Sequence, residues 1–455
     1  MSMINIALSG AQAAQAALHA SSQNISNVMT PGYTRQGVLL SSLQPQEAGS
    51  GSAGSGVQVT ALLRFSDSYK SQQLWSANAQ LGGYDTMQPY LVQLEQVMSS
   101  STASINVVLD GFFKALNAAS VDPLSSPLRQ QVLTSAGALA QGFNTLSQLL
   151  SDQRVSVSAQ RSSMVTQINA YSSAIAKFNQ EISAAQASGV NASGLIDQRD
   201  ITIDQLAKLV GVQVVNQPSG ARNVSLLNGQ PLVADNLAAT LELNTTASGQ
   251  QITVRFAKES FLLADSQLGG ALGGLGTLEQ QTLQPLQQSL ADMASGLAGM
   301  VNGQLAAGTT PGGTAGQPLF VVTPGSNRLS VTPGLLAQDL AFSGDGQPGD
   351  SGNLQQIIAL RSQPVLVTSL GTVTLGDAYT QLMGVLGTQS QQNQTALSTA
   401  QTVRTQAEES WKSTSGVSQD EEAVNLVQYQ QMYQANMKVI AVANQLFDST
   451  LAMMG

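Results

Sequence analysis

The chain has 455 residues, of which 10% are charged and 4% aromatic, and its formal net charge is −9. An acidic chain without a cluster of Lys and Arg lacks the electric field that attracts phosphate backbones, so this composition excludes nucleic acid as a partner. The absence of cysteine excludes disulfides, thiolate nucleophiles and cysteine-based metal sites, and no residue pattern requires a cofactor.

The first predicted element is a helix that runs to about Asn27 and is ended by Thr30-Pro31-Gly32. It contains no Asp, Glu, Lys or Arg. Small and apolar residues recur in it at steps of three and four, as in the a/d seam of a coiled coil: Ile4, Ala7, Ala11, Ala14, Leu18, Ser21, Ile25 and Val28. No basic segment precedes the apolar residues, and Gln and Asn interrupt them. We therefore expect neither a Sec-type signal peptide nor a membrane span.

The middle of the chain changes from helical to strand-like periodicity and back. A Gly/Ser-rich segment at residues 47–56 is expected to be a flexible loop. Apolar spacing predicts helices over residues 65–98, 128–187, 197–210, 286–305 and 378–411, with a further helix from about residue 354. Short runs between turn signals predict strands at residues 212–215, 223–227, 240–243 and 252–256. The Gly- and Pro-rich stretch 309–352 is expected to extend this β domain.

The last predicted helix starts after Ser418, which forms a capping box with Glu421. Only Lys438 and Asp448 are charged in its body, and a second seam follows the same spacing: Ala423, Leu426, Gln430, Tyr433, Met437, Ile440, Asn444, Phe447, Leu451 and Met454. The two seams are expected to face each other. Because the outer faces also lack charge, we expect them to be buried against further copies of the chain, and an ordinary intramolecular helix pair is the alternative.

The residues predicted to form this assembly interface lie on both terminal helices: Ile4, Leu8, Ala11, Leu18, Ile25, Leu426, Tyr433, Met437, Ile440, Phe447 and Leu451. The predicted fold class is mainly α with an inserted β domain, elongated, with a coiled coil of terminal helices, a helical-bundle rod and a small β domain at the far end. The corresponding domains are 1–60 plus 416–455, then 61–211 plus 271–308 and 353–415, and finally 212–270 plus 309–352.

Outside the cap of the last helix, the densest ionisable cluster is Asp197, Arg199, Asp200 and Asp204. Carboxylates this close could serve acid/base or metal chemistry, but helix capping by Asp197 and surface ion pairing by Arg199 explain them better. The Gly-rich segment 268–276 resembles a phosphate loop, yet no Lys-Ser or Lys-Thr follows it, so a structural role is expected. No catalytic or metal-binding residue is predicted.

Two runs near the N-terminus, 20–27 and 30–35, resemble the signature shared by bacterial flagellar rod, hook and hook-associated proteins. The matching motif residues are Asn24, Asn27, Pro31, Gly32, Tyr33 and Arg35. Further matches narrow the resemblance to the FlgK family of hook-associated proteins at the hook–filament junction. These are residues 195–200 with 210–212, then 376–379, and the tail from Ser415 to Asp448.

That resemblance implies a structural axial protein of the flagellum and not an enzyme. It implies export through the flagellar type III apparatus and assembly outside the cell as a hook–filament junction adaptor. The implied partners are further copies of the chain, the hook protein, the neighbouring hook-associated junction protein, and an export chaperone that shields Tyr433, Ile440 and Phe447 of the C-terminal helix. Many members carry a further outer domain where this chain has only residues 309–352, so a separate outermost domain is not expected.

Three other interpretations remain open at this point. Another axial protein, namely a second junction protein or a hook or rod subunit, shares the N-terminal signature. An enzyme acting on cell-wall glycan would use two of the clustered Asp residues. A secreted effector or adhesin would use its helical ends on membranes, and binding of the free monomer to liposomes would favour it.

Overall fold

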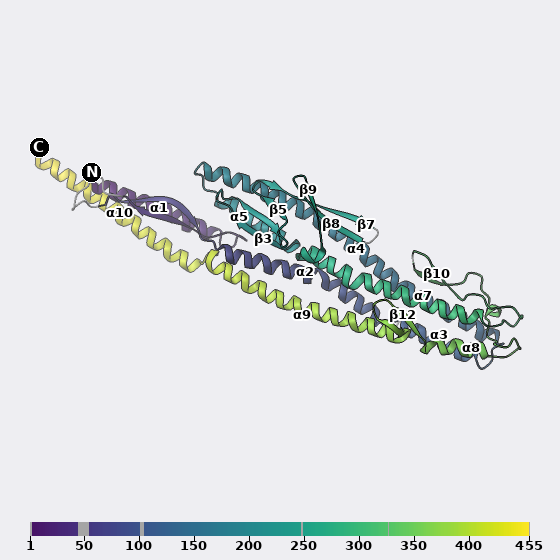
Figure 1. Ribbon diagram of the computed structural model, residues 1–455. Coiled ribbons are helices and arrows are strands. Elements are labelled where there is room, and N and C mark those ends of the chain that lie inside the picture. The colour runs from purple at the N-terminus through teal and green to yellow at the C-terminus, as the bar shows by residue number, and fades with distance from the viewer. Residues whose placement is uncertain (1, 44–53, 101–103, 247–248, 326, 455) are drawn as a thin grey trace.

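The computed structural model describes residues 2–43, 54–100, 104–246, 249–325 and 327–454. The molecule is elongated and mainly helical, and both termini lie at the same end (Figure 1). This confirms the predicted fold class of a mainly α protein with inserted β structure. Within the described ranges, no helix is long and apolar enough to cross a membrane. Of the predicted loop at 47–56, residues 47–53 lie outside the described residues.

The end that carries the termini is built from two helices and one hairpin, which we call the terminal unit. Its helices are α1 (Ser2–Ser26) and α10 (Gln419–Met454), and its strands are β1 (Gln36–Ser42) and β2 (Val57–Arg64). The strands pair antiparallel, with Gln36 opposite Arg64 and Ser42 opposite Val57. The hairpin packs on α1, so this helix lies between α10 and the strands.

Two long helices, α2 (Ser68–Ser99) and α9 (Leu375–Ser415), pack side by side and lead away from the terminal unit (Figure 1). The other helices of the rod are α3 (Ile105–Ala119), α4 (Ser126–Ala187), α5 (Ser193–Leu209), α6 (Gly270–Leu278), α7 (Gln284–Ala306) and α8 (Gly352–Ala359). Pro127 stands in the first turn of α4, where its missing N–H leaves no helical hydrogen bond unmade. A π-helical turn, Glu279–Leu283, joins α6 to α7.

The rod core contains the apolar seams predicted for its helices. Phe112 packs edge-to-face against Phe113 and Phe320, with ring centroids 5.5 and 5.8 Å apart. The buried Tyr379 hydroxyl donates to the Met98 carbonyl at 2.7 Å and so ties α9 to α2. Where α6 crosses α2, a Cβ on Gly274 would lie 2.5 Å from the Gly83 carbonyl oxygen. The glycines of segment 268–276 therefore permit close helix packing, which is a structural role.

Among the residues that the structure describes, the strands form five antiparallel sheets. The four-stranded sheet contains β3 (Val212–Asn216), β4 (Arg222–Leu226), β5 (Pro231–Ala234) and β6 (Leu237–Ala238), and the three-stranded sheet contains β7 (Thr240–Thr246), β8 (Gly249–Phe256) and β9 (Glu259–Leu263). Two further hairpins pair β10 (Phe320–Thr323) with β11 (Arg328–Val331), and β12 (Pro364–Val367) with β13 (Gly371–Thr374).

The position of the β structure differs from the sequence-based expectation in two ways. The two larger sheets lie beside α4, part-way along the molecule, while α3, α8 and the loops near β10 form the end opposite the termini (Figure 1). Segment 309–352 does not extend those sheets, because its hairpin β10–β11 packs on α4 and α7 instead. Asn144 of α4 fixes it there, since its side chain exchanges two hydrogen bonds with the backbone of Leu329, at 2.7 and 3.0 Å.

Candidate assembly interface

The terminal helices α1 and α10 pack against each other in antiparallel orientation, which confirms their predicted pairing. Ser21 meets Glu422 near one end of the pair, and Gly10 meets Asn436 farther along. A Cβ added to Gly10 would lie 2.5 Å from Asn436 Oδ1, so the two helices approach closely at this point. The buried residues of the predicted α1 seam are small: Ala7, Ala11, Ala14 and Ser21.

On α10, the seam that faces α1 is displaced from the predicted one at every second position. The shielded residues are Glu422, Asn425, Leu426, Tyr429, Tyr433, Asn436, Ile440 and Ala443. Leu426, Tyr433 and Ile440 were predicted, whereas Gln430, Met437 and Asn444 are exposed. Hydrophobicity favoured Met437 over its neighbour, but the small residues of α1 leave room for the Asn436 amide, which lies against Gly10.

The predicted interface residues therefore divide into two groups. Ala11 is buried, and Ile4, Leu18, Ile25, Leu426, Tyr433 and Ile440 are half-buried within the terminal unit. Leu8, Met437, Phe447 and Leu451 are exposed. The last turns of α10 extend past the start of α1, so they have no partner helix (Figure 1).

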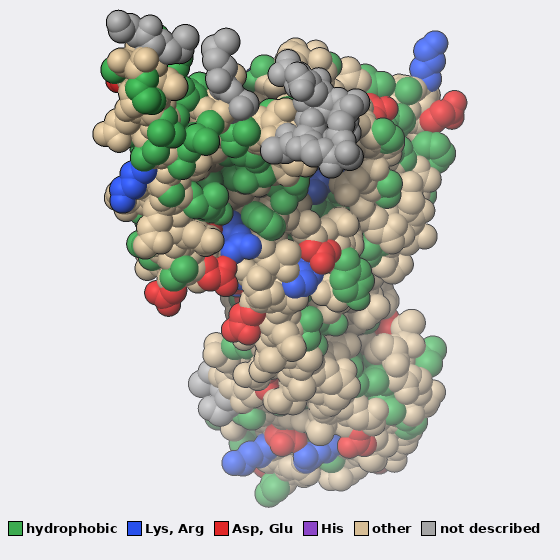
Figure 2. Space-filling view, turned by 90° about the vertical axis from the view of Figure 1, so that its left-hand side faces the viewer, with side chains coloured by type: hydrophobic (Ala, Val, Ile, Leu, Met, Phe, Trp, Pro, Cys, Tyr) green, Lys and Arg blue, Asp and Glu red, His purple; other side chains and the backbone are tan. Residues whose placement is uncertain are grey.

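Apolar side chains without a partner surround α10 on its remaining faces. Those exposed are Val424, Val427, Met432, Met437, Val439, Val442, Leu446, Phe447, Leu451 and Met453. The hairpin adds Leu39, Leu40, Val59, Leu62 and Leu63. We call these residues the terminal apolar surface, and Figure 2 shows hydrophobic side chains gathered at this end of the molecule. Exposed apolar surface on this scale is typical of sites that bind a partner.

The family-like motif of residues 24–35 forms the loop that closes the base of α1. The buried Asn24 amide donates to the Gln36 carbonyl at 2.8 Å, and its oxygen accepts from Tyr33 Oη and from the Gln36 N–H, both at 2.9 Å. Gly32 has φ +74, and a Cβ there would lie 2.4 Å from Ile201 of α5. Both constraints require glycine at this position. Burial, followed by the negative charges of Asp197 and Glu422, raises the pKa of Tyr33 to about 12.

Arg35 connects the same loop to the junction between α9 and α10. Its N–H donates to the Ser415 carbonyl at 2.8 Å, and its guanidinium pairs with Glu421 at 2.6 Å while lying 4.5 Å from the centre of the Phe65 ring. The Glu421 N–H contacts Ser418 Oγ at 3.4 Å, which is one half of the predicted capping box. The Glu421 carboxylate binds Arg35, so it does not complete the other half.

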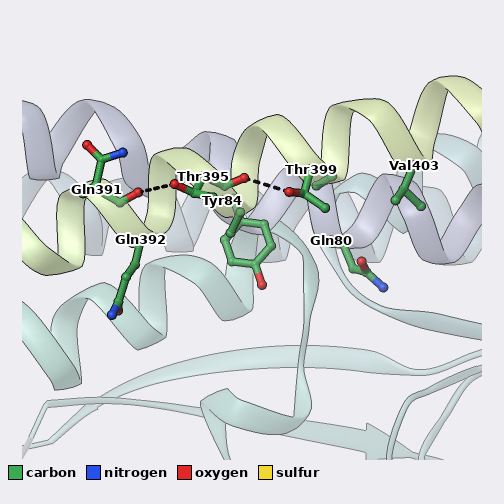
Figure 3. Close-up of a pocket in the computed structure, with 9 residues that line it drawn as sticks. Gln80, Tyr84, Gln391, Gln392, Thr395, Thr399 and Val403 are labelled. Carbon is green, nitrogen blue, oxygen red and sulfur yellow. Dashed lines mark hydrogen bonds between the residues drawn. The ribbon is translucent and has the colours of Figure 1, made fainter.

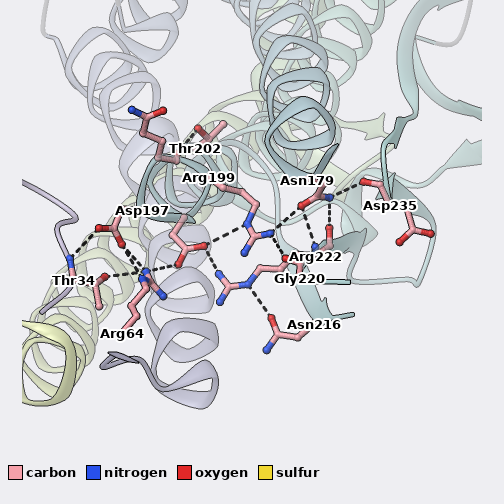
Figure 4. A network of polar contacts seen from close by, with 12 residues as sticks. Thr34, Arg64, Asn179, Asp197, Arg199, Thr202, Asn216, Gly220, Arg222 and Asp235 are labelled. Carbon is pink, nitrogen blue, oxygen red and sulfur yellow. Dashed lines mark hydrogen bonds and ion pairs between the residues drawn. The ribbon is translucent and has the colours of Figure 1, made fainter. Parts of the chain in front are cut away.

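A buried polar network joins the terminal unit to the rod, and Figure 4 shows it at close range. Arg64, at the end of β2, binds Asp197 at 2.8 Å and Asp200 at 2.9 Å, and also donates to Thr34 Oγ1 at 2.8 Å. Asp200 also pairs with Arg222 of β4. The network thus connects the motif loop and the hairpin to α5 and to the four-stranded sheet.

The predicted capping role of Asp197 was wrong, and the ion pair of Arg199, with Asp200 at 3.8 Å, is buried instead of lying on the surface. Helix α5 begins at Ser193, so Asp197 lies inside it and binds Arg64 instead of capping the helix. Arg199 is buried and donates to Asn179 Oδ1 at 3.0 Å and to the Gly220 carbonyl at 2.7 Å. Burial raises the pKa of Asp197, although Arg64 and Thr34 oppose the rise. Burial lowers the pKa of Arg199 to about 10, and the positive charge of Arg222 acts in the same direction.

Sequence reasoning missed Arg64, Asn179 and Arg222, which hold this network together from three different elements. Asn179 of α4 accepts from Arg199 and exchanges hydrogen bonds with the backbone of Arg222, at 2.8 and 3.0 Å. Arg64 could have been noticed, since it is a lone charge at the end of an apolar strand in a charge-poor region. Asn179 and Arg222 carry no comparable signal in the sequence.

In the described ranges, no group of three His, Cys, Asp or Glu side chains could hold a metal ion. A groove of about 420 Å³ between α2 and α9 is lined by Gln, Thr, Ala, Tyr84 and Val403 and by no acid, base or histidine (Figure 3). Its threonine hydroxyls donate within α9, from Thr395 to the Gln391 carbonyl and from Thr399 to the Thr395 carbonyl.

Two protein families match parts of the chain. The helical domain of the flagellar hook-associated protein FlgK matches residues 91–320. The C-terminal region of the flagellar basal body rod proteins FlgEFG matches residues 413–453, which cover most of α10. The chain is also similar to a solved structure, the flagellar hook junction protein FlgK from Burkholderia pseudomallei. That similarity has 34% identity and a TM-score of 0.52, and it covers 55% of this chain and 47% of the other.

Relatives named flagellar hook-associated protein 1 match the chain over nearly its whole length. The protein of Escherichia coli is 28% identical and that of Salmonella typhimurium 29% identical, each with 99% of both chains covered. The protein of Bacillus subtilis is 27% identical, with 97% of this chain and 96% of its own length covered.

Proposed function

The chain belongs to the FlgK family of flagellar hook-associated proteins, and we propose that it acts as the adaptor that joins hook to filament. Its role is structural, at the hook–filament junction of the flagellum outside the cell. The observation that supports the adaptor role is the terminal apolar surface, which is exposed because α1 covers only one face of α10. Copies of the chain packed side by side would cover the remaining faces.

The energy available from this contact supports coupled ordering and assembly. Burying a large apolar side chain contributes roughly 1.5 to 3 kcal/mol, and ordering a residue costs about 1 to 2 kcal/mol of backbone entropy. For a helix with apolar residues on several faces, the free energy of burial offsets this entropy cost only when partners cover several of those faces. We infer that the terminal unit reaches its full stability in the assembled junction.

The proposed partners are those that the family resemblance implies. We propose that further copies of the chain, the hook protein and the neighbouring junction protein contact the terminal unit. Before assembly, an export chaperone would cover Tyr433, Ile440 and Phe447 of α10. Export would use the flagellar type III apparatus without a cleaved signal peptide. We further propose that the chain has no catalytic activity, because the relatives that it matches are structural proteins of the flagellum.

The test is filament retention in a strain that lacks this protein. The strain is complemented with the full chain or with a version that lacks residues 423–455, and attached filaments are counted by electron microscopy. Restored filaments with the full chain, together with bare hooks and shed filament protein with the truncated version, support the proposal. Filaments that stay attached without any copy of the protein would refute it.

A further inference from the structure

The methionines of this chain differ in exposure between the rod and the terminal unit. In the rod, Met98, Met164 and Met293 are buried, and Met87, Met300 and Met383 are partly buried against the core. In the terminal unit and its loop, the methionines whose side chains the structure describes are all exposed: Met3, Met29, Met432, Met437 and Met453. Since the chain has no cysteine, these thioethers are the most accessible sulfur atoms among the side chains that the structure describes.

Three of the exposed methionines lie on α10, outside its contact with α1. Met432 and Met437 are 41% and 43% exposed, and Met453 is 79% exposed. No charged residue occurs from Ala423 to Met437, so the first two thioethers lie in a wholly uncharged part of the helix. Flexible, polarizable methionine side chains suit a surface that must adapt to a partner, but they also make that surface chemically vulnerable.

We propose that Met432, Met437 and Met453 are oxidation sites through which peroxide blocks assembly of the free subunit. This inference rests on the proposed function, because the same surface must be buried in the junction. In each step the peroxide O–O bond breaks and one oxygen atom is transferred to the thioether sulfur. The sulfur loses two electrons, the peroxide is reduced to water, and a sulfoxide remains.

The consequence for assembly follows from the polarity of the product. A sulfoxide carries a strong hydrogen-bond acceptor where the thioether was apolar, and burial leaves that acceptor without a partner. The assembled junction would be protected, since neighbouring copies would cover the sulfur atoms. The modification is reversible, because methionine sulfoxide reductases specific for the two epimers restore the thioether.

The experiment treats the purified full chain with hydrogen peroxide and locates sulfoxides by peptide mass spectrometry. Treated and untreated samples are then sedimented with hooks isolated from cells that lack this protein. We expect oxidation at Met432, Met437 and Met453 well before Met98, Met164 and Met293. We also expect the treated chain to lose cosedimentation and to regain it after incubation with both reductases.

Two variants show which methionines matter, each read as the ratio of treated to untreated cosedimentation. In the triple variant Met432→Leu/Met437→Leu/Met453→Leu, the ratio should stay near one, because treated and untreated samples should cosediment equally. It should fall as in the wild type in the rod control Met98→Leu/Met293→Leu. Equal loss in both variants, or rod methionines that oxidise as fast as those of α10, would overturn the inference. If untreated chain fails to bind hooks, the proposed function fails, and that outcome is distinct from site-selective oxidation.

Discussion

The Ser21 hydroxyl donates a 2.7 Å hydrogen bond to Glu422 across 401 residues of sequence, and both side chains are buried. This contact lies where the last helix begins and where α1 approaches its end. It brings the two ends of the chain into one packed unit and fixes the register in which α1 and α10 align.

Replacing Glu422 with Ala should destabilise the terminal unit. The change leaves the buried Ser21 hydroxyl without its acceptor, and hydrogen bonds to charged groups contribute about 1.5 to 3 kcal/mol. Hydrogen exchange of α1 amides should therefore accelerate in Glu422→Ala. The matched control is Glu421→Ala, whose carboxylate is largely exposed and whose loss should cost at most about 1 kcal/mol. Equal acceleration in the two variants would contradict this assignment.

Asp197→Asn should weaken the connection between the terminal unit and the rod. The Arg64 and Asp197 side chains are only 11% and 10% exposed, and breaking a buried pair costs roughly 3 kcal/mol, reduced here because Asp200 still binds Arg64. Urea unfolding measures the loss. Glu181→Gln removes an exposed contact with Lys177 on α4 and should change the free energy of unfolding by less than about 0.5 kcal/mol.

Alkaline pH should loosen the motif loop through Tyr33. Its pKa is about 12 in the folded protein against 10.0 for an ordinary tyrosine. Between these values the unfolded chain releases the phenol proton and the folded chain keeps it. Stability is therefore complete below pH 10 and falls as the pH rises through 12. Tyr33→Phe should unfold with a shallower dependence on pH in this range, and an unchanged slope would show that Tyr33 does not cause the loss.

Gly32→Ala should destabilise the loop, whereas Gly194→Ala should not. At Gly32 the positive φ and the 2.4 Å approach to Ile201 act together, and strain of this kind costs about 1 to 3 kcal/mol. At Gly194, in the first turn of α5, a Cβ would meet nothing within 4 Å, so the helix should gain up to about 1 kcal/mol. Thermal unfolding of the two variants should therefore shift in opposite directions.

Periodicity predicted the long helices α4 and α7 because their apolar seams are long, but helices α3 and α6 were not predicted. It also predicted that the two ends would pair, since both seams have the same spacing. It failed at Met437 and Asn436, where the choice between neighbouring positions depends on the shape of the partner helix. The role of Asp197 was not predictable, because its partners Arg64 and Thr34 are more than 130 residues away in the chain. The location of the hairpin β10–β11 likewise depends on its tertiary contact with Asn144.

The most direct test of the assembly surface is filament retention in cells whose only copy of this protein carries Phe447→Asp. Phe447 is 63% exposed on the part of α10 that extends past α1, so the charge should leave the rod folded and prevent only docking. Val155→Asp, at a 67% exposed apolar position on α4, is the matched control. The account predicts bare hooks and shed filament protein with Phe447→Asp, and attached filaments with Val155→Asp. Normal filaments with Phe447→Asp would contradict it.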